Sequence, residues 1–135
     1  MLLVLTLQIK IILFMEKLKI HPSAIKIISE YQCYPIWLYD INEIDRICNS
    51  MAIFEYKDEL QKRLPNIKTE WLPISMSLID QINNWDSIYQ KSFINTSYEF
   101  SFMFESKEQE LFFFNKKREI IEKLKKELPC MNIYE

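Results

Sequence analysis

The spacing of apolar and polar residues predicts three short β-strands. Residues 25–29 (IKIIS) are rich in β-branched side chains, and residues 36–40 (IWLYD) alternate between two faces, as strands do. These two segments are close enough in sequence to pair as a hairpin through a wide loop. The clearest alternation lies at residues 98–104 (YEFSFMF), where aromatic residues occupy every second position. We expect these three segments to form one mainly antiparallel sheet.

Steps of three and four residues between apolar positions predict helices elsewhere in the chain. Residues 52–64 place apolar side chains on one side and stop at a proline, and residues 42–51 are typical of a loop or a short helical turn. The segment 75–93 is clearer, because Ser75 is a candidate N-cap and apolar residues follow it at helical steps. Trp85 belongs to that apolar stripe, so we interpret it as a core residue.

A last helix is predicted over residues 106–128. Ser106 is its candidate N-cap, and Gln109 three residues later completes a capping box. The apolar face of this helix is predicted to contain Leu111, Phe114, Ile121, Leu124 and Leu128. Together the elements predict one α+β domain over residues 15–135, in which two amphipathic helices pack on a small, mainly antiparallel sheet.

Residues 1–14 stand apart from that domain as an N-terminal extension. The run LLVLTLQIKIILF has no basic leader and no small-residue cleavage site, so it does not match a secretory signal. It is also shorter than the roughly 20 apolar residues of a transmembrane helix, and no membrane partner is expected. Its polar residues alternate with Leu5, Leu7, Ile9 and Ile11, which predicts a half-buried strand. The alternative that we favour takes Met15 as the true start and the preceding residues as translated upstream sequence.

Composition removes several classes of function. The 135-residue chain contains no glycine, which excludes a glycine-rich phosphate loop, a dinucleotide-binding turn and a G-x-S-x-G nucleophile elbow. Its formal charge of −2 does not favour nucleic acid as a partner. The three cysteines and one histidine lack the spacing of a zinc site, and an odd cysteine count fits a reducing cytoplasm. We therefore expect a cytoplasmic protein with no cofactor and no metal.

Charge is distributed unevenly along the chain. Residues 1–29 carry four lysines and one glutamate, whereas residues 30–60 carry seven acidic and two basic residues. An acidic face built from this middle segment would attract a basic partner and speed the encounter. A solvated acidic loop is the plainer alternative.

The run SEYQCYPIWLYD, from Ser29 to Asp40, resembles a signature of a family of small bacterial proteins. The sequence departs from that signature at Gln32, where the family usually has glycine, and in a longer insert between Asp40 and Leu72. Weaker pieces of the same pattern follow in the same order, and they are Leu72-Pro73-Ile74-Ser75, Trp85, Tyr89, Phe104, Ser106 and Glu127-Leu128.

Members of this family resemble immunity proteins of polymorphic or contact-dependent toxin systems. The resemblance implies a non-enzymatic protein that binds one cognate toxin domain and blocks it. An acidic and aromatic surface suits a basic toxin, because tyrosine and tryptophan supply rigid contact area and carboxylates supply specificity and fast association. The candidate partner-binding residues are Glu30, Tyr31, Tyr34, Trp37, Tyr39, Asp40, Glu43 and Asp45.

Other interpretations of the same residues stay open. Each aromatic residue of the set has core packing as its alternative, Trp37 above all. A small carboxylate-dependent enzyme would use Glu30 and Asp40 as an acid/base pair at the ends of adjacent strands, although no nucleophile, metal cluster or phosphate cradle accompanies them. A nucleic-acid-associated regulator and a structural scaffold are further alternatives.

Overall fold

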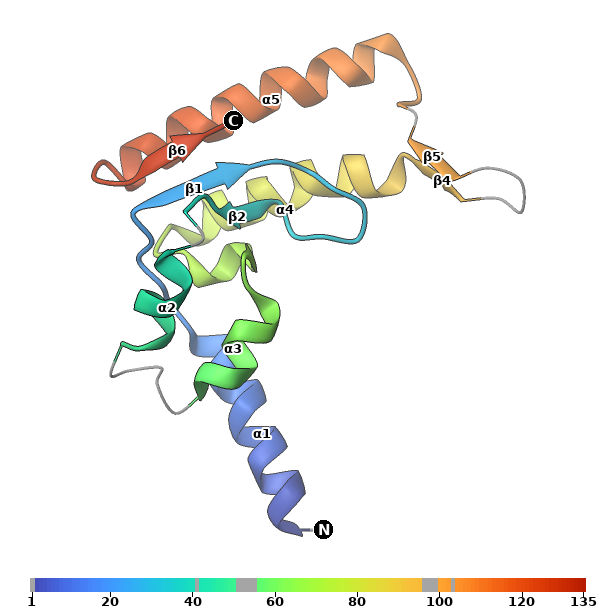
Figure 1. The fold of residues 1–135 in the computed structure, drawn as a ribbon. Helices are drawn as coiled ribbons and strands as arrows, with labels where there is room; N and C mark the ends of the chain where they lie inside the picture. Colours follow the sequence, from blue (N-terminus) through green and yellow to red (C-terminus); the bar gives the residue numbers. More distant parts are fainter. Residues whose placement is uncertain (1, 41, 51–55, 96–99, 103) are drawn as a thin grey trace.

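The structure is a computed structural model that describes residues 2–40, 42–50, 56–95, 100–102 and 104–135. Short strands and helices alternate along the chain, and Figure 1 shows their arrangement. The elements are α1 (Leu2–Lys17), β1 (Ala24–Ile27), β2 (Ile36–Leu38), α2 (Glu43–Cys48), α3 (Lys57–Arg63), β3 (Asn66–Ile67), the 3-10 helix η2 (Thr69–Trp71), α4 (Met76–Lys91), β4 (Phe93–Asn95), β5 (Phe100–Phe102), α5 (Lys107–Glu127) and β6 (Asn132–Tyr134).

The main sheet has the strand order β3-β2-β1-β6. β1 and β2 form the predicted antiparallel hairpin, with Ile27 opposite Ile36. β3 extends the sheet antiparallel to β2, and β6 lies parallel to β1 at the opposite edge. The α+β fold class predicted from the sequence is confirmed, whereas β3 and β6 were not predicted. Both are only two or three residues long, too short for a periodic pattern to show.

The inner face of the main sheet forms the centre of the core. Facing residues in register place their side chains on the same side of a sheet, and the six inner positions are all isoleucine or leucine. They are Ile25, Ile27, Ile36, Leu38, Ile67 and Ile133. All but Ile133 are buried, and they form one cluster with Ile82 and Trp85 of α4 and Leu124 of α5. Helices α4 and α5 therefore cover this face.

The two long helices begin where the sequence predicted. Ser75 accepts a hydrogen bond from the backbone N–H of Leu78, and Ser106 accepts one from the N–H of Gln109, so both N-caps are confirmed. The side chain of Gln109 accepts a hydrogen bond from the N–H of Glu105, one residue before the position that a capping box uses. This arrangement still satisfies a backbone donor at the start of α5.

The buried face of α5 is rotated from the predicted one. Leu111 and Phe114 were assigned to the core but are exposed, and Phe113 is buried in their place. Its ring stacks on that of Trp85 with the centroids 4.7 Å apart. The indole N–H of Trp85 donates to the backbone carbonyl of Phe113 over 2.9 Å. Three consecutive phenylalanines at residues 112–114 offer two possible helix phases, and the stack with Trp85 selects one of them.

The strand predicted at residues 98–104 does not join the main sheet. Its described part, β5, pairs antiparallel with β4 in a separate two-stranded sheet, which projects at one side of the molecule in Figure 1. Residues 98, 99 and 103 lie outside the described residues. The prediction of a strand is right and its assigned partner is wrong, because β4 follows α4 directly and supplies a local hairpin partner.

The N-terminal segment is a helix, so the predicted strand at residues 5–11 is wrong. α1 rests on the domain through a stripe at helical spacing, formed by Ile11, Phe14, Met15 and Leu18. The carbonyl of Met15 accepts a hydrogen bond from the indole N–H of Trp71 over 2.9 Å. This stripe crosses the boundary that the sequence suggested at Met15. Among the described helices, none has the length and apolar character needed to cross a membrane.

The remaining predicted elements agree with the structure within its described range. α2 is the short helical turn expected within residues 42–51, and α3 occupies the second half of the helix expected over residues 52–64. Residues 51–55 lie outside the described residues.

Candidate protein-binding surface

The outer face of the main sheet brings together two of the predicted binding residues, Trp37 and Tyr39. Register places Trp37 beside Lys26 on one side and Asn66 on the other, and Tyr134 lies opposite Lys26 from the far edge. Tyr39 extends the same face, because its N–H donates to the carbonyl of Ala24 beyond the end of β2. In Figure 1 the arrows of β2 and β6 lie in front of α4 and α5, on the side of the sheet that these helices leave open.

A pair of stacked tyrosines forms an exposed part of this outer face. The rings of Tyr39 and Tyr134 lie 4.0 Å apart at an interplanar angle of 17°. Tyr39 is 54% exposed and Tyr134 is 41% exposed. Stacking restricts both rings before any partner arrives, so they lose little conformational entropy on binding. The sequence identified Tyr39 but not Tyr134, because the parallel pairing of β6 with β1 is visible only in the fold.

Tyr34 is a second exposed aromatic residue and lies before the other end of β2. The ammonium of Lys68 lies 5.9 Å from the centroid of its ring, within the range of a cation–π contact. The side chain of Asn66 bonds both the N–H and the carbonyl of Tyr34. Tyr34 therefore sits on a fixed backbone with its side chain exposed.

Trp37 lies between Tyr34 and Tyr39 in β2 and is half-buried. Its indole N–H donates to the backbone carbonyl of Ile28 over 3.2 Å. The tryptophan thus packs along its own hairpin and leaves part of the ring accessible. Core packing therefore describes only part of the side chain, and the prediction that Trp37 contacts a partner concerns the exposed part.

The predicted residues Glu30 and Tyr31 lie on the loop between β1 and β2, which α4 holds in place. The side-chain amide of Gln90 donates to the carbonyl of Glu30 over 2.8 Å, and its oxygen accepts from the N–H of Gln32. Gln32 has φ of 58°, in the left-handed region that favours glycine. The family resemblance placed glycine at this position, and this chain adopts the left-handed backbone there with glutamine. Glu30 is exposed and Tyr31 is half-buried.

Asp86 forms the other attachment of this loop to α4. Its carboxylate accepts a hydrogen bond from the hydroxyl of Ser29 over 2.9 Å. Burial raises the pKa of Asp86, and the bonds from Ser29 and Gln90 oppose that rise. Burial also raises the pKa of the nearby Cys33 thiol, and the charges of Glu30 and Asp86 add to the effect. A thiol held in its neutral form is a poor nucleophile.

The three carboxylates near α2 occupy different environments. Asp40 and Asp45 are exposed. The side chain of Asp40 accepts a hydrogen bond from the N–H of Asn42 over 2.9 Å, which is a turn typical of aspartate. Glu43 is only 6% exposed. The prediction that Glu43 contacts a partner assumed an exposed side chain, and the structure does not provide one.

Glu43 instead fixes the start of β1. Its carboxylate accepts bonds from the N–H and hydroxyl of Ser23 and from the N–H of Ala24, and it pairs with Arg46. Burial alone would raise the pKa of Glu43, but the bonds from Ser23 and Arg46 together lower it. The carboxylate is therefore held in its charged form by groups of this chain.

The charges on the outer face are mixed rather than uniformly acidic. Lys26 and Lys68 lie among the aromatic residues, and Asp40 and Asp45 lie beyond the Tyr39 end of β2. The acidic residues predicted as one patch are thus divided by the hairpin. Glu30 follows the end of β1, whereas Asp40 follows the opposite end of the ladder.

This separation bears on the enzyme alternative. Ile36 lies at the end of the ladder nearer Glu30, and the four residue steps from Ile36 to Asp40 span roughly 13 Å at the rise of a strand. This is too far for Glu30 and Asp40 to act on one substrate atom. Among the described residues, no three His, Cys, Asp or Glu side chains are grouped as metal ligands. The geometry therefore supports a binding surface better than an acid/base pair.

A family model described as Serratia CdiI immunity protein-like matches residues 56–132, more than half of the chain. The matched segment runs from α3 through α5 to the start of β6 and contains the weaker pieces of the sequence pattern, including Trp85 and Ser106. The run from Ser29 to Asp40, which carried the resemblance in the sequence, lies outside the match. The comparison with curated proteins finds no match.

Proposed function

The chain belongs to the Serratia CdiI immunity protein-like family, and from this premise we propose that it neutralises one cognate toxin domain by binding it directly. Family membership supports a toxin-neutralising role in general, and proteins of this kind are generally non-enzymatic. The proposal adds the mode of action, which is binding through the outer face of the main sheet.

The exposed Tyr39–Tyr134 stack carries this proposal. Large aromatic groups near the centre of an interface supply most of its binding energy. Tyr134 lies in β6, and Tyr39 directly follows β2, where its backbone N–H is bonded to Ala24. Trp37 and Tyr34 continue the aromatic surface along β2. The sheet beneath is held by the apolar core, so the partner meets a preformed surface.

Asp40 and Asp45 provide the electrostatic part of the proposal. Asp40 directly follows Tyr39 at the rim of the aromatic surface, and Asp45 lies on α2; both residues are exposed. Rim charges act mainly on the rate of association and on specificity. A basic toxin domain would be drawn to this end of the sheet, where the tyrosine pair is most exposed.

The test uses the toxin domain encoded beside the gene of this chain, with binding measured by titration calorimetry. We expect a stable complex with the unaltered protein. The double variant Tyr39→Ala/Tyr134→Ala is expected to weaken binding by about a thousandfold, as for two hot-spot residues at about 2 kcal/mol each. Phe112→Ala is the matched control, because Phe112 is an aromatic residue on α5 that is 56% exposed.

The carboxylates are tested separately by stopped-flow kinetics. Asp40→Lys/Asp45→Lys is expected to slow association, and the effect should weaken as salt is added. Asp80→Lys/Glu105→Lys changes the same number of exposed charges outside this surface and should leave association unchanged. A complex that tolerates the tyrosine double variant would refute the sheet surface. Absence of any complex with the neighbouring toxin domain would refute direct binding.

A further inference from the structure

Helix α1 presents apolar side chains to solvent on a scale unmatched by the other described helices. Leu3 is 87% exposed, and the exposed set continues along the helix. Its members are Leu3, Val4, Leu5, Leu7, Ile9, Ile12 and Leu13. In Figure 1 the N-terminal half of α1 extends away from the sheet and from the helices that cover it. A contiguous apolar surface of this kind marks a site of interaction.

The exposed residues form a second apolar stripe, distinct from the one that rests on the domain. Leu5, Ile9 and Ile12 follow one another in steps of four and three residues, so they share one side of the helix. The domain-facing stripe is offset from them and includes Ile11, Phe14 and Leu18. α1 is thus apolar on two sides, and only one of them is covered by described residues.

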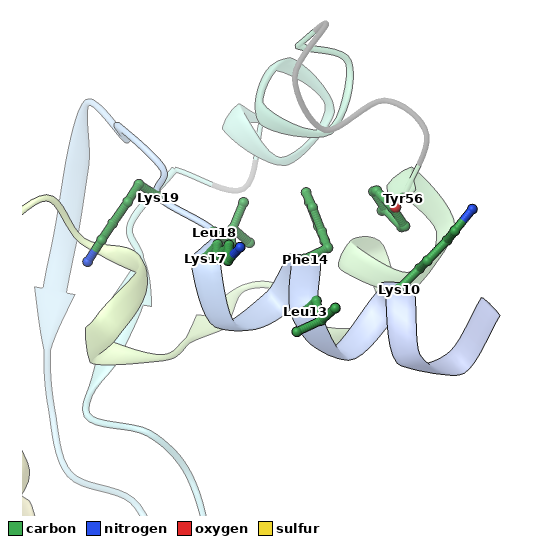
Figure 2. A pocket seen from close by; sticks show the side chains of 7 residues that line it. All are labelled: Lys10, Leu13, Phe14, Lys17, Leu18, Lys19 and Tyr56. Carbon is green, nitrogen blue, oxygen red and sulfur yellow. The ribbon is translucent and has the colours of Figure 1, made fainter. Parts of the chain in front are cut away.

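Two lysines flank the exposed stripe on one side of the helix. Lys10 and Lys17 are seven residues apart, two helical turns, and both line a hollow of about 570 Å³ between α1 and Tyr56. Figure 2 shows Lys10 extending past Tyr56 at one end of the hollow and Lys17 beside Leu18 at the other. The floor is apolar, and the ring of Phe14 stacks on that of Tyr56 with centroids 4.1 Å apart.

The ammonium groups of Lys10 and Lys17 differ from that of Lys19. Lys19 donates to the backbone carbonyls of Glu70 and Leu72. Its ammonium group is therefore hydrogen-bonded within the domain. No described residue forms an ion pair with Lys10 or Lys17. These two cations therefore remain available to an anionic partner beside the apolar stripe.

From this arrangement we propose that α1 binds the surface of an anionic lipid bilayer. The helix lies in the plane of the membrane surface, with Leu5, Ile9 and Ile12 in the acyl region and Lys10 and Lys17 among the phosphates. A helix with an exposed apolar surface beside basic residues binds a membrane surface through buried apolar area together with attraction to anionic headgroups. Lysine suits the boundary because its long apolar stem lets the charge reach the headgroups. The inference is independent of the proposed toxin binding.

A bilayer fits the surface better than a second copy of this chain. Pairing of two α1 helices would use the stripe at Leu5, Ile9 and Ile12, but that seam is shorter than the three to four heptads of a stable coiled coil. An anionic bilayer covers the stripe at Leu5, Ile9 and Ile12 and meets the charges of Lys10 and Lys17 at the same time.

The test is sedimentation of the full chain with lipid vesicles. We expect binding to vesicles that contain phosphatidylglycerol, weaker binding to pure phosphatidylcholine, and loss of the difference in high salt. Lys10→Glu/Lys17→Glu should reduce partitioning into the anionic vesicles by about 30-fold, counting roughly fivefold for each lysine near the surface. Lys91→Glu/Lys126→Glu, on exposed positions of α4 and α5, is the matched control and should bind like the unaltered protein.

A second pair of variants tests the contribution of the apolar side chains to vesicle binding. Leu5→Gln/Ile9→Gln should reduce vesicle binding by about tenfold or more, whereas Leu111→Gln/Phe112→Gln makes the same change on exposed residues of α5 and should not. Circular dichroism verifies that each variant stays folded. Equal binding to both lipids, no binding to either, or a concentration-dependent dimer that involves α1 would each overturn the proposal.

Discussion

The two faces of the main sheet share the same strands but differ in side-chain chemistry. The inner face is built only from isoleucine and leucine, most of them fully buried under α4 and α5. The outer face carries tyrosine, tryptophan, lysine and asparagine at the alternate positions of the same strands. Because side chains alternate along a strand, one segment such as IWLYD encodes both faces.

This difference separates stability from recognition. Burial of inner-face side chains provides most of the free energy that holds the sheet together, and the outer residues contribute little to it while exposed. Outer positions can therefore vary in chemistry without loss of the fold. A protein that must fit one particular toxin gains from such a division, because specificity residues change independently of the core.

The largest expected effect is that substitutions on the inner face lower stability, whereas substitutions on the outer face lower toxin binding. Ile27→Ala removes a fully buried side chain and should lower the free energy of unfolding by about 3 kcal/mol. Tyr39→Ala should lower it by less than about 1 kcal/mol, mainly through loss of the stack with Tyr134. Urea denaturation measures both values. For binding of the folded protein to the toxin domain, we expect the opposite order, with Tyr39→Ala causing the larger loss of affinity. Equal destabilisation by the two variants would contradict the division between the two faces.

A charged residue that is buried beside the hairpin provides the next test. Glu43→Gln removes the partner of Arg46 and weakens the bonds to Ser23 and Ala24, so we expect a loss of about 2 kcal/mol at neutral pH. The folded-state pKa of Glu43 is lowered. Its contribution is therefore present above the ordinary glutamate pKa of about 4.3 and is lost as the pH falls through the folded-state pKa.

Urea denaturation at neutral and acidic pH checks this prediction. The difference between Glu43→Gln and the unaltered protein should shrink as the carboxylate of the latter becomes protonated. Asp45→Asn is the matched control, because Asp45 lies on the same helix and is exposed, and it should change stability by less than about 0.5 kcal/mol. A loss that is independent of pH would assign Glu43 a packing role instead.

Local signals in the sequence predicted the elements that depend on neighbouring residues. The hairpin of β1 and β2 and the caps at Ser75 and Ser106 follow from patterns a few residues long, and the structure confirms them. Strand alternation placed Tyr39 on the opposite face of the hairpin from Leu38, and the family resemblance proposed it as a binding residue. These features need no knowledge of the rest of the chain.

Features that depend on distant contacts were missed or misassigned. β6 pairs with β1 across most of the chain, so neither the sheet edge nor the partner of Tyr39 was visible in sequence. The helix at α1 was taken for a strand because its polar residues alternate with leucine and isoleucine. The helical spacing of the apolar residues Ile11, Phe14 and Leu18 indicated a helix. The domain boundary predicted at Met15 divided this pattern, so the spacing was not recognised. The burial of Glu43 was not predicted, because its charge gave no sign of the backbone donors around it.

The smallest expected effect concerns the loop that joins the two strands of the hairpin. Gln32 has φ of 58°, and a residue with a Cβ pays about 1 kcal/mol for that conformation. Gln32→Gly removes this cost but gives the unfolded chain more freedom, so a net gain of about 0.5 kcal/mol is expected. The N–H that donates to Gln90 is kept.

Gln32→Val provides the opposite change at the same position. A β-branched side chain tolerates the left-handed region least, so this variant should lose about 1 kcal/mol or more, and the order of stability should be Gly, then Gln, then Val. Thermal unfolding of the three proteins measures the order. If valine were as stable as glutamine, the turn would not require the left-handed backbone. The expected order has a physical cause: Gln90 and Asp86 hold the loop in this conformation, and the backbone at position 32 must be left-handed. Glycine adopts that backbone without a loss of stability.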